Sequence, residues 1–386
     1  MSLRSAWSVA LVALAVFSCG EPSRATLERD PALGGSGVTP TASASAPIAT
    51  ASAVASSAAL ATAQVSAEVT ASAVAPEGPA STPLIADPTT PIDGSFLANA
   101  KDGILKPGFA DKIIGPGRMS GVILVSAGAE PHERLRYKFG ENAKQTTLMR
   151  TKTSMVSPQQ SVTLPTVEMT LELSTGALDA ATGLIAVSGA LTQVEVKPAE
   201  DAQSKKMAAA MAPGLQFIKG MSVGYLVDPL GKATDVSLKV AGPSNAATDK
   251  LIGEMKHQFE SLVPPLPEQP IGVGAEWQVI QRVNSGVEIL QWTTYKLTKK
   301  KGDKIKLTAT VQQLAASATV MTPQKSAAPV ILLSYDGSGS AETRMALSSI
   351  GPDAGVGSVK NVIRFEEAKR PITTETLVKL EFERKK

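Results

Sequence analysis

Cysteine and long apolar runs are nearly absent from this chain of 386 residues. Its single cysteine, Cys19, excludes an internal disulfide, so an exported domain would have to be stabilised by its core alone. After the first 18 residues, no stretch reaches 18 uninterrupted apolar residues. Because a spanning helix needs about 20 such residues, we expect no membrane passage in the remainder of the chain.

The residues and motifs of common catalytic sites are also scarce. Histidine occurs only twice, and the nucleophile elbow G-x-S-x-G, the Walker A loop and the dinucleotide motif G-x-G-x-x-G are all missing. The glycine clusters at Gly337–Ser340 and Gly355–Gly357 lack the context of these motifs and indicate turns between strands. We therefore expect no catalytic serine unit and no cofactor.

A metal site would have to use one of the two histidines. His132 lies in a segment that indicates a loop, whereas His257 lies three residues from both Glu254 and Glu260 on a predicted helix. That spacing would place the three side chains along one face, where they could hold a divalent metal. Surface clusters of this kind are usually solvated, and the paired histidines of zincins are missing, so we expect no metal site.

Paired carboxylates are the hardest catalytic arrangement to exclude from a sequence. Glycosidases place two acids on opposite sides of a cleft. Glu366 and Glu367 are adjacent and would point to opposite faces of a strand, whereas Glu381 and Glu383 would share the solvent-exposed face. Aromatic residues, on which sugars stack, make up only 4% of the chain, which disfavours a carbohydrate substrate. A carboxylate-dependent hydrolase in the cell envelope stays as the alternative function.

The N-terminus is the most informative segment that is present. Arg4 precedes an apolar run from Trp7 to Phe17, which is too short to span a membrane and is typical of a signal peptide. Val16, Ser18 and Cys19 then fit the lipobox of bacterial lipoproteins. This resemblance implies cleavage after Ser18, a diacylglyceryl thioether on Cys19 and subsequent N-acylation. Residues 1–18 are therefore predicted to be a lipoprotein signal peptide.

Several acyl chains on Cys19 would anchor the mature protein to a membrane, because each buried methylene contributes about 0.8 kcal/mol. The alternative is an ordinary secretory signal, which Ala13, Ala15 and Ser18 would also support. Gly20 follows the cysteine, in the place where an aspartate retains lipoproteins at the inner membrane of some bacteria. We therefore expect a lipid-anchored protein of the bacterial cell envelope, with the outer membrane favoured.

The next segment has the composition of a tether. Residues 20–93 are dominated by Ala, Ser, Thr and Pro, so that residues 19–93 are predicted to form a lipidated cysteine followed by a disordered linker. As a flexible coil, such a linker would have an r.m.s. span of roughly 50 Å. The remaining residues, 94–386, carry a mild positive charge that is too diffuse to indicate binding of nucleic acid.

The region 94–386 is predicted to be rich in β-strands. Apolar residues alternate with Lys, Glu and Thr, as in antiparallel strands with one face on a core and the other in water. The clearest segments are Leu135–Phe139, Val167–Leu173, Val194–Val196, Ile305–Val311 and Leu377–Phe382. The fold class is therefore mainly β (α+β). The strands would form either one curved antiparallel sheet or two related β halves, at 119–241 and 276–386.

Two segments depart from this alternation and predict helices. An amphipathic helix is expected near 244–263, capped at Ser244 or Asn245 and ended by Pro264 and Pro265. A weaker helix is expected over residues 201–211, where the propensities of Lys, Met and Ala are favourable. The first helix would lie against the curved sheet or join its two halves.

The segment Pro264–Trp277 carries a resemblance to a known family. Its prolines, the glycines Gly272 and Gly274, and a tryptophan at the start of a strand are similar to an uncharacterised family of exported and lipid-anchored bacterial proteins rich in β-strands. The resemblance would cover residues 133–384 and implies no catalytic residues, because none is established for that family. We expect Trp277 to be a core residue that packs against the helix near 244–263.

Taken together, these features predict a non-enzymatic protein. A strand-rich domain on a long tether would present a face or cleft to an apolar ligand or to a partner in the cell envelope. The membrane itself would be a partner through the acyl chains on Cys19. A purely structural scaffold is the third class of function that the sequence allows.

Overall fold

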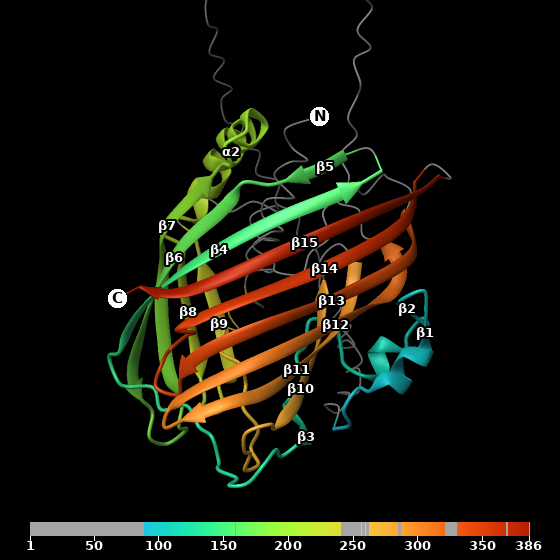
Figure 1. The fold of residues 1–386 in the computed structure, drawn as a ribbon. Helices are drawn as coiled ribbons and strands as arrows, with labels where there is room; N and C mark the ends of the chain where they lie inside the picture. Colours follow the sequence, from blue (N-terminus) through green and yellow to red (C-terminus); the bar gives the residue numbers. More distant parts are fainter. Residues whose placement is uncertain are drawn as a thin grey trace, which may run out of the picture. The chain divides into compact units, whose positions relative to one another are not determined.

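The computed structural model describes residues 89–158, 160–240, 256, 259, 262–284, 287–320, 330–367 and 370–385. These residues belong to one compact unit, which is mainly β (Figure 1). The mainly β class predicted from the alternating pattern is therefore confirmed. None of the helices in these ranges is long and apolar enough to cross a membrane.

Fifteen strands and four helical segments make up the described fold. The strands are β1 (Ala100–Lys101), β2 (Ile104–Leu105), β3 (Ile123–Ser126), β4 (Lys144–Ser157), β5 (Gln160–Thr163), β6 (Thr166–Leu178), β7 (Ile185–Lys197), β8 (Ser222–Val227), β9 (Ala233–Lys239), β10 (Glu276–Asn284), β11 (Val287–Lys301), β12 (Lys304–Val320), β13 (Val330–Ala346), β14 (Ala354–Glu367) and β15 (Arg370–Lys385). The helical segments are the 3-10 helices η1 (Gly94–Asn99), η2 (Ala110–Lys112) and η3 (Gln216–Ile218), and the α-helix α2 (Ala202–Leu215).

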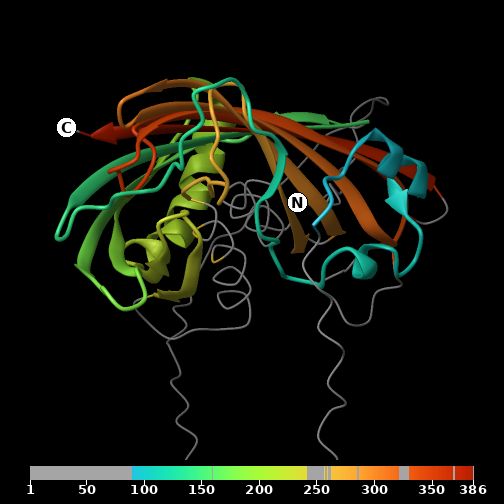
Figure 2. The same cartoon turned by 90° about the horizontal axis from the view of Figure 1, so that it is seen from below.

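All the long strands form one antiparallel sheet. Their order is β3-β10-β11-β12-β13-β14-β15-β4-β6-β7-β8-β9, and the two end strands do not pair with each other. The sheet is curved, and α2 lies on its concave side (Figure 2). Strands from 119–241 and 276–386 meet at two places in this sheet, where β15 pairs with β4 and β10 pairs with β3. A curved antiparallel sheet is thus the arrangement that the chain adopts.

The alternation of side chains explains how the concave face acquires its core. In β6, the odd-numbered residues of Val167–Leu173 are buried on the concave face, whereas Glu168 and Glu172 lie on the convex face. Met211 and Leu215 of α2 belong to the same buried cluster as those β6 residues. The helix therefore covers the end of the sheet formed by β6, β7 and β8.

A second cluster covers the concave face near β10. Trp277 is fully buried, donates its indole N–H to the Pro265 carbonyl oxygen at 2.8 Å, and stacks on Tyr295 with ring centroids 5.8 Å apart. Its prediction as a core residue is confirmed. Gly272 is also explained, because a Cβ at this position would clash with the carbonyl oxygen of Ala129.

The segment before β3 covers the convex face of β10, β11 and β12. Ile92, two residues before the expected start of the folded region, is buried and exchanges two hydrogen bonds of 2.8 Å with the side chain of Gln278. Phe96 packs edge-on against Trp292, with ring centroids 5.9 Å apart. Apolar residues of β11 are buried on both faces, Ile289 on one and Leu290 and Trp292 on the other, because both faces of this strand are covered.

The hairpin of β1 and β2 inserts its tip into an opening between β12 and β13. These strands pair up to Gln313 and again from Thr319, but not in between. The Tyr335 N–H donates to the Asp102 carbonyl oxygen at 2.9 Å, and the Ala315 N–H donates to that of Gly103 at 3.0 Å. The hairpin tip therefore satisfies backbone groups that the two strands leave open.

The helix predictions have different outcomes. The weaker helix of residues 201–211 is confirmed as α2, which Asp201 caps by accepting a hydrogen bond of 2.7 Å from the Ser204 N–H. Most of the helix expected near 244–263 lies outside the described residues. Of the four described positions within it, Lys256 and Phe259 are helical and Leu262 and Val263 are not. Phe259 is buried in the cluster that contains α2.

One predicted strand is wrong. The segment Leu135–Phe139 is extended, but it lies outside the sheet, with the Tyr137 N–H bonded to the Pro229 carbonyl oxygen and the Lys138 N–H to that of Leu347. Its alternating pattern is nevertheless real, because Leu135 and Tyr137 are buried and Arg136 is not. Period-two burial here arises from packing of an extended loop on the core.

The two glycine clusters predicted as turns are also wrong. Gly337–Ser340 lies inside β13, and Gly355–Gly357 lies inside β14. The reason for the glycine in β13 is close packing, since a Cβ on Gly337 would lie 2.5 Å from Gln313 Oε1 and 2.8 Å from Asn361 Oδ1. Glycine within an otherwise alternating pattern marks crowding in this sheet and not the end of a strand.

The inserted hairpin tip can be tested with a matched pair of substitutions. Gly103 and Gly108 have similar positive φ angles, 76° and 70°, but a Cβ on Gly103 would clash with the Tyr335 carbonyl oxygen, whereas a Cβ on Gly108 meets nothing. Gly108→Ala should cost about 1 kcal/mol from strain alone, and Gly103→Ala about 2–4 kcal/mol because the clash adds to it. Equal losses in chemical denaturation would contradict the insertion.

Candidate functional site

A row of uncharged polar side chains crosses the concave face of the central strands. Gln291, Gln313, Gly337, Asn361 and Thr376 are successive cross-strand partners from β11 to β15. Three further polar residues lie on the same face, two positions along their strands from this row. We define the polar band as Gln291, Gln313, Tyr335, Asn361, Thr374, Thr376 and Thr153, each at most 4% exposed.

Hydrogen bonds connect the first half of the polar band. Gln313 donates to Gln291 Oε1 at 2.7 Å, and the Tyr335 hydroxyl donates to Gln313 Oε1 at 2.8 Å. The side-chain amide of Asn361 lies 3.2 Å from the same hydroxyl. Because Gly337 lies between Gln313 and Asn361 without a side chain, both amides can approach Tyr335. The band is therefore a connected network across four strands.

The second half of the polar band is not satisfied. Five buried side-chain atoms in the described part of the chain have no hydrogen-bond partner, and three of them belong to the band: Asn361 Nδ2, Thr374 Oγ1 and Thr153 Oγ1. Turning the Asn361 amide over would only exchange which of its two polar atoms lacks a partner. Buried polar atoms are nearly always paired in folded proteins, so this concentration on one face indicates a site for a bound polar group.

Apolar side chains border the polar band on both sides. One flanking row contributes the apolar residues Val311, Val359 and Val378, beside Thr293 and Thr153. The other contributes Ile289, Ala315 and Ile363, beside Tyr335 and Thr374 of the band. In these three rows, none of the concave residues of β11 to β15 has a charged side chain. The arrangement can hold a molecule that is apolar over most of its surface and has uncharged polar groups at its centre.

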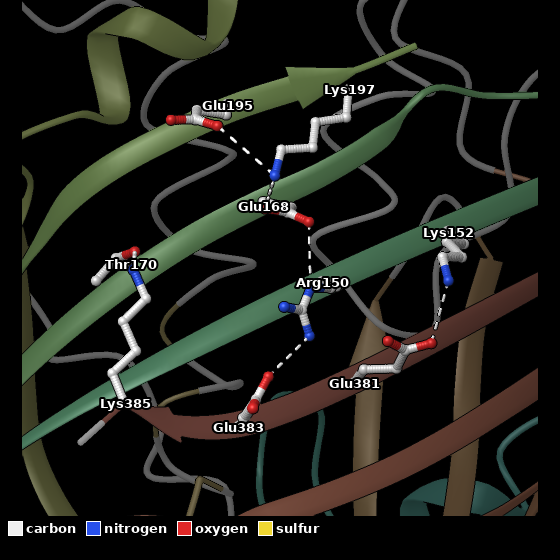
Figure 3. Close-up of polar contacts among 9 residues, drawn as sticks. All are labelled: Arg150, Lys152, Glu168, Thr170, Glu195, Lys197, Glu381, Glu383 and Lys385. Carbon is white, nitrogen blue, oxygen red and sulfur yellow. Dashed lines mark hydrogen bonds and ion pairs between the residues drawn. The ribbon is translucent and has the colours of Figure 1, made fainter. Parts of the chain in front are cut away.

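The convex face of β4, β6, β7 and β15 has the opposite character (Figure 3). Arg150 of β4 pairs with Glu168 of β6 and with Glu383 of β15, both at 3.1 Å, and Glu168 also pairs with Lys197. Partial burial opposes ionisation of Glu168, but the hydrogen bonds and charges of Lys197 and Arg150 outweigh it and lower its pKa. This face is a solvated ladder of ion pairs.

A cleft of about 430 Å³ opens next to the hairpin tip, and residues from both faces of β12 and β13 line it, among them Gln313 and Tyr335 of the polar band. Trp292, Leu314 and Val362 contribute apolar walls, and the carboxylates of Asp102 and Asp336 line it as well. Both aspartates are exposed, whereas the general acid of a glycosidase is normally held in a buried, apolar environment. Their exposure disfavours carboxylate catalysis in this cleft.

Among the acidic residues singled out from the sequence, Glu366, Glu381 and Glu383 have described side chains, and these do not form a pair across a cavity. Glu381 and Glu383 share the convex face, as predicted, where they pair with Lys152 and Arg150. Glu366 is exposed on β14. Glu381 and Glu383 thus belong to the ladder of ion pairs rather than to a cleft.

The remaining candidates do not converge on a site. His132 is exposed, and its Nε2 atom lies 3.0 Å from the Gly128 carbonyl oxygen. No group of three potential metal ligands occurs among the described residues. Glu254, His257 and Glu260, together with Cys19, lie outside those residues. The metal and lipidation predictions at these positions stay predictions.

Comparison with known proteins gives no family. No protein-family model matches this chain, and no curated protein matches it. The resemblance to exported and lipid-anchored proteins that the segment Pro264–Trp277 suggests therefore stays a prediction.

Sequence reasoning missed the polar band, although the signal was present. Gln313 and Asn361 occupy core-facing positions of alternating segments, where an apolar residue is expected. The segments recognised from the sequence stopped at Val311, two residues before Gln313. Extending the alternation through the glycines of β13 and β14 would have placed these amides on the buried face.

The convex ladder yields a prediction that depends on pH. Glu168→Gln should lower the free energy of unfolding at neutral pH by about 1 kcal/mol, because two ion pairs are lost. Since the pKa of Glu168 is lowered in the folded state, this stabilisation is present above the unfolded pKa, about 4.3, and is lost as the pH falls through the folded value.

Chemical denaturation of the unsubstituted protein and of Glu168→Gln, at several pH values from neutral to acidic, measures the difference in their free energies of unfolding. Glu195→Gln is the matched control, because Glu195 is 61% exposed and 3.9 Å from Lys197. Its substitution should have almost no effect at any pH. A cost of Glu168→Gln that persists undiminished in acid would show that the substitution disturbs packing and not an ion pair.

Proposed function

We propose that this protein is a membrane-anchored lipoprotein of the bacterial cell envelope that binds an apolar ligand without catalysing a reaction. The observation that carries the proposal is the contrast between the two faces of one sheet. The concave face is uncharged across the central strands, whereas the convex face carries a ladder of ion pairs. A soluble domain that carries apolar molecules needs this combination.

The N-terminal sequence supports the location. The lipobox that ends at Cys19 favours an acyl anchor, and the composition of residues 20–93 favours a long flexible tether between that anchor and the domain. Such a tether would let the domain reach from the membrane into the surrounding aqueous compartment. Gly20 favours the outer membrane as the site of anchoring.

An envelope protein as the partner receives less support than an apolar ligand. A protein interface on the convex face would require a contiguous apolar patch. The large apolar residues exposed there, Val156, Ile331 and Val356, lie on three different strands and are not cross-strand neighbours. The hydrolase alternative is also not favoured, because the two acids that line the described cleft are exposed.

The anchor is tested by replacing its attachment point. Cys19→Ser, exported from an ordinary secretory leader in place of residues 1–18, should move the protein from the membrane pellet to the soluble fraction. Ser23→Ala behind the native leader is the control and should stay in the pellet, because it leaves the lipobox unchanged. If the Cys19→Ser protein sediments with membranes as before, the lipid anchor is wrong.

Binding of an apolar ligand is tested on the same soluble full-length protein. We expect organic extraction of the purified protein, followed by mass spectrometry, to recover apolar compounds in near-stoichiometric amount. A periplasmic protein purified by the same steps is the control for lipid carried over from the membrane. Recovery equal to that control, both before and after incubation with membrane extract, would contradict the proposed function.

A further inference from the structure

We infer that the polar band recognises uncharged oxygen-bearing groups of the ligand, so that the protein is selective for neutral amphiphiles such as lipids with ester or hydroxyl groups. This inference rests on the proposed function and specifies its ligand class. It starts from three unpartnered polar atoms, on Asn361, Thr374 and Thr153, which are buried on one face of the sheet.

The three unpartnered groups are close enough to contact one molecule. Asn361 is the cross-strand partner of Thr376, so Thr374, two residues earlier on β15, lies diagonally across from it. Thr153 is the partner of Val378 on the next strand, two residues on from Thr376. Adjacent strands lie about 4.8 Å apart and each residue advances a strand by about 3.4 Å, so Thr374 and Thr153, one strand and four residues apart, are separated by roughly 14 Å. A ligand that satisfies all three needs more than one polar atom.

The chemistry of these groups restricts what they can bind. Threonine hydroxyls and an asparagine amide both donate and accept hydrogen bonds, so they suit carbonyl, ester and hydroxyl oxygens. Among the described concave residues in the three rows of β11 to β15, no charged side chain is available to pair with a phosphate, carboxylate or ammonium group. Transfer of an unpaired charge into such a setting is strongly unfavourable, which excludes charged head groups from the band.

The apolar residues beside the polar band can contact the apolar part of the ligand. Val359 and Val378 lie on one side of Asn361 and Thr376, and Ile363 and Phe365 lie on the other, so apolar chains could extend in both directions along the strands. A peptide fits this pattern poorly, because its backbone carries a donor and an acceptor at nearly every residue and would need partners along its whole length. A neutral lipid has its few oxygens grouped between apolar chains.

Three probes and one substitution test the selectivity. Soluble full-length Cys19→Ser protein is incubated with phosphatidylcholine vesicles that contain labelled diacylglycerol, phosphatidic acid or squalane, and the label that leaves with the protein is measured after the vesicles are removed. We expect diacylglycerol to bind most tightly. Phosphatidic acid has the same chains with a charged head, and squalane has no polar atom.

Thr374→Val removes one unpartnered hydroxyl without changing the shape of the side chain greatly. The folded protein should be at least as stable, because a buried hydroxyl without a hydrogen-bond partner is removed. Diacylglycerol binding should weaken about tenfold, whereas squalane binding should not change. Thr373→Val is the matched control, since Thr373 is the neighbouring residue on the exposed convex face. It should change neither stability nor binding.

The outcomes separate the two proposals. If none of the probes binds the Cys19→Ser protein that carries no further substitution, the proposed function fails and the inference fails with it. If all three probes bind equally, or Thr374→Val weakens squalane and diacylglycerol alike, an apolar ligand is supported but recognition through the polar band is overturned. Loss confined to diacylglycerol, with an unchanged unfolding transition, supports the inference.

Discussion

The alternation of side chains along β-strands is the constraint on which the rest of this structure depends. One long antiparallel sheet assigns successive residues of each strand to opposite faces, so a single sequence pattern produces two surfaces of different chemistry. Arg150, for example, joins the convex ion pairs, while its neighbour Thr151 is buried on the concave face. The sheet is curved and its end strands do not pair, so its uncharged surface lies on the inside of the curve although the sheet is not closed.

The cover over each face differs along the sheet and determines where a ligand can be held. Near β6 to β8, α2 and its cluster fill the concave side with packed apolar residues. Near β10, Trp277 and the segment from Val263 to Ala275 do the same. Between these two clusters lies the polar band, where buried amides and hydroxyls replace aliphatic side chains. Unpaired polar groups beside such a network would destabilise an ordinary apolar core. In a binding face they can form hydrogen bonds with a ligand.

Many strands of the fold were predictable from local sequence patterns. A strand with one buried and one solvent-exposed face has alternating apolar and polar residues whatever its neighbours are. β6, β7, β12 and β15 were recognised in this way, as were the burial of Trp277 and the helix after Asp201. Leu135–Phe139 was assigned wrongly, since burial alternates in extended loops as well. The glycines of β13 and β14 were assigned to turns, because crowding by Gln313, Asn361 and Val359 comes from strands distant in sequence. The polar band as a whole could not be predicted, because its residues come from six strands. They are brought together only by the pairing register between those strands, which no single segment of the sequence determines.

The central claim, that the concave face of β12 to β15 holds a neutral apolar ligand, is tested most directly by photocrosslinking. A diacylglycerol with a diazirine in one acyl chain would be equilibrated with the soluble full-length protein, irradiated, and located by mass spectrometry of the digested peptides. The account predicts labels on the concave residues of these strands, such as Val359, Ile363 and Val378. Labels confined to convex residues such as Val156 and Val356, or no labels above those on an unrelated protein, would contradict it.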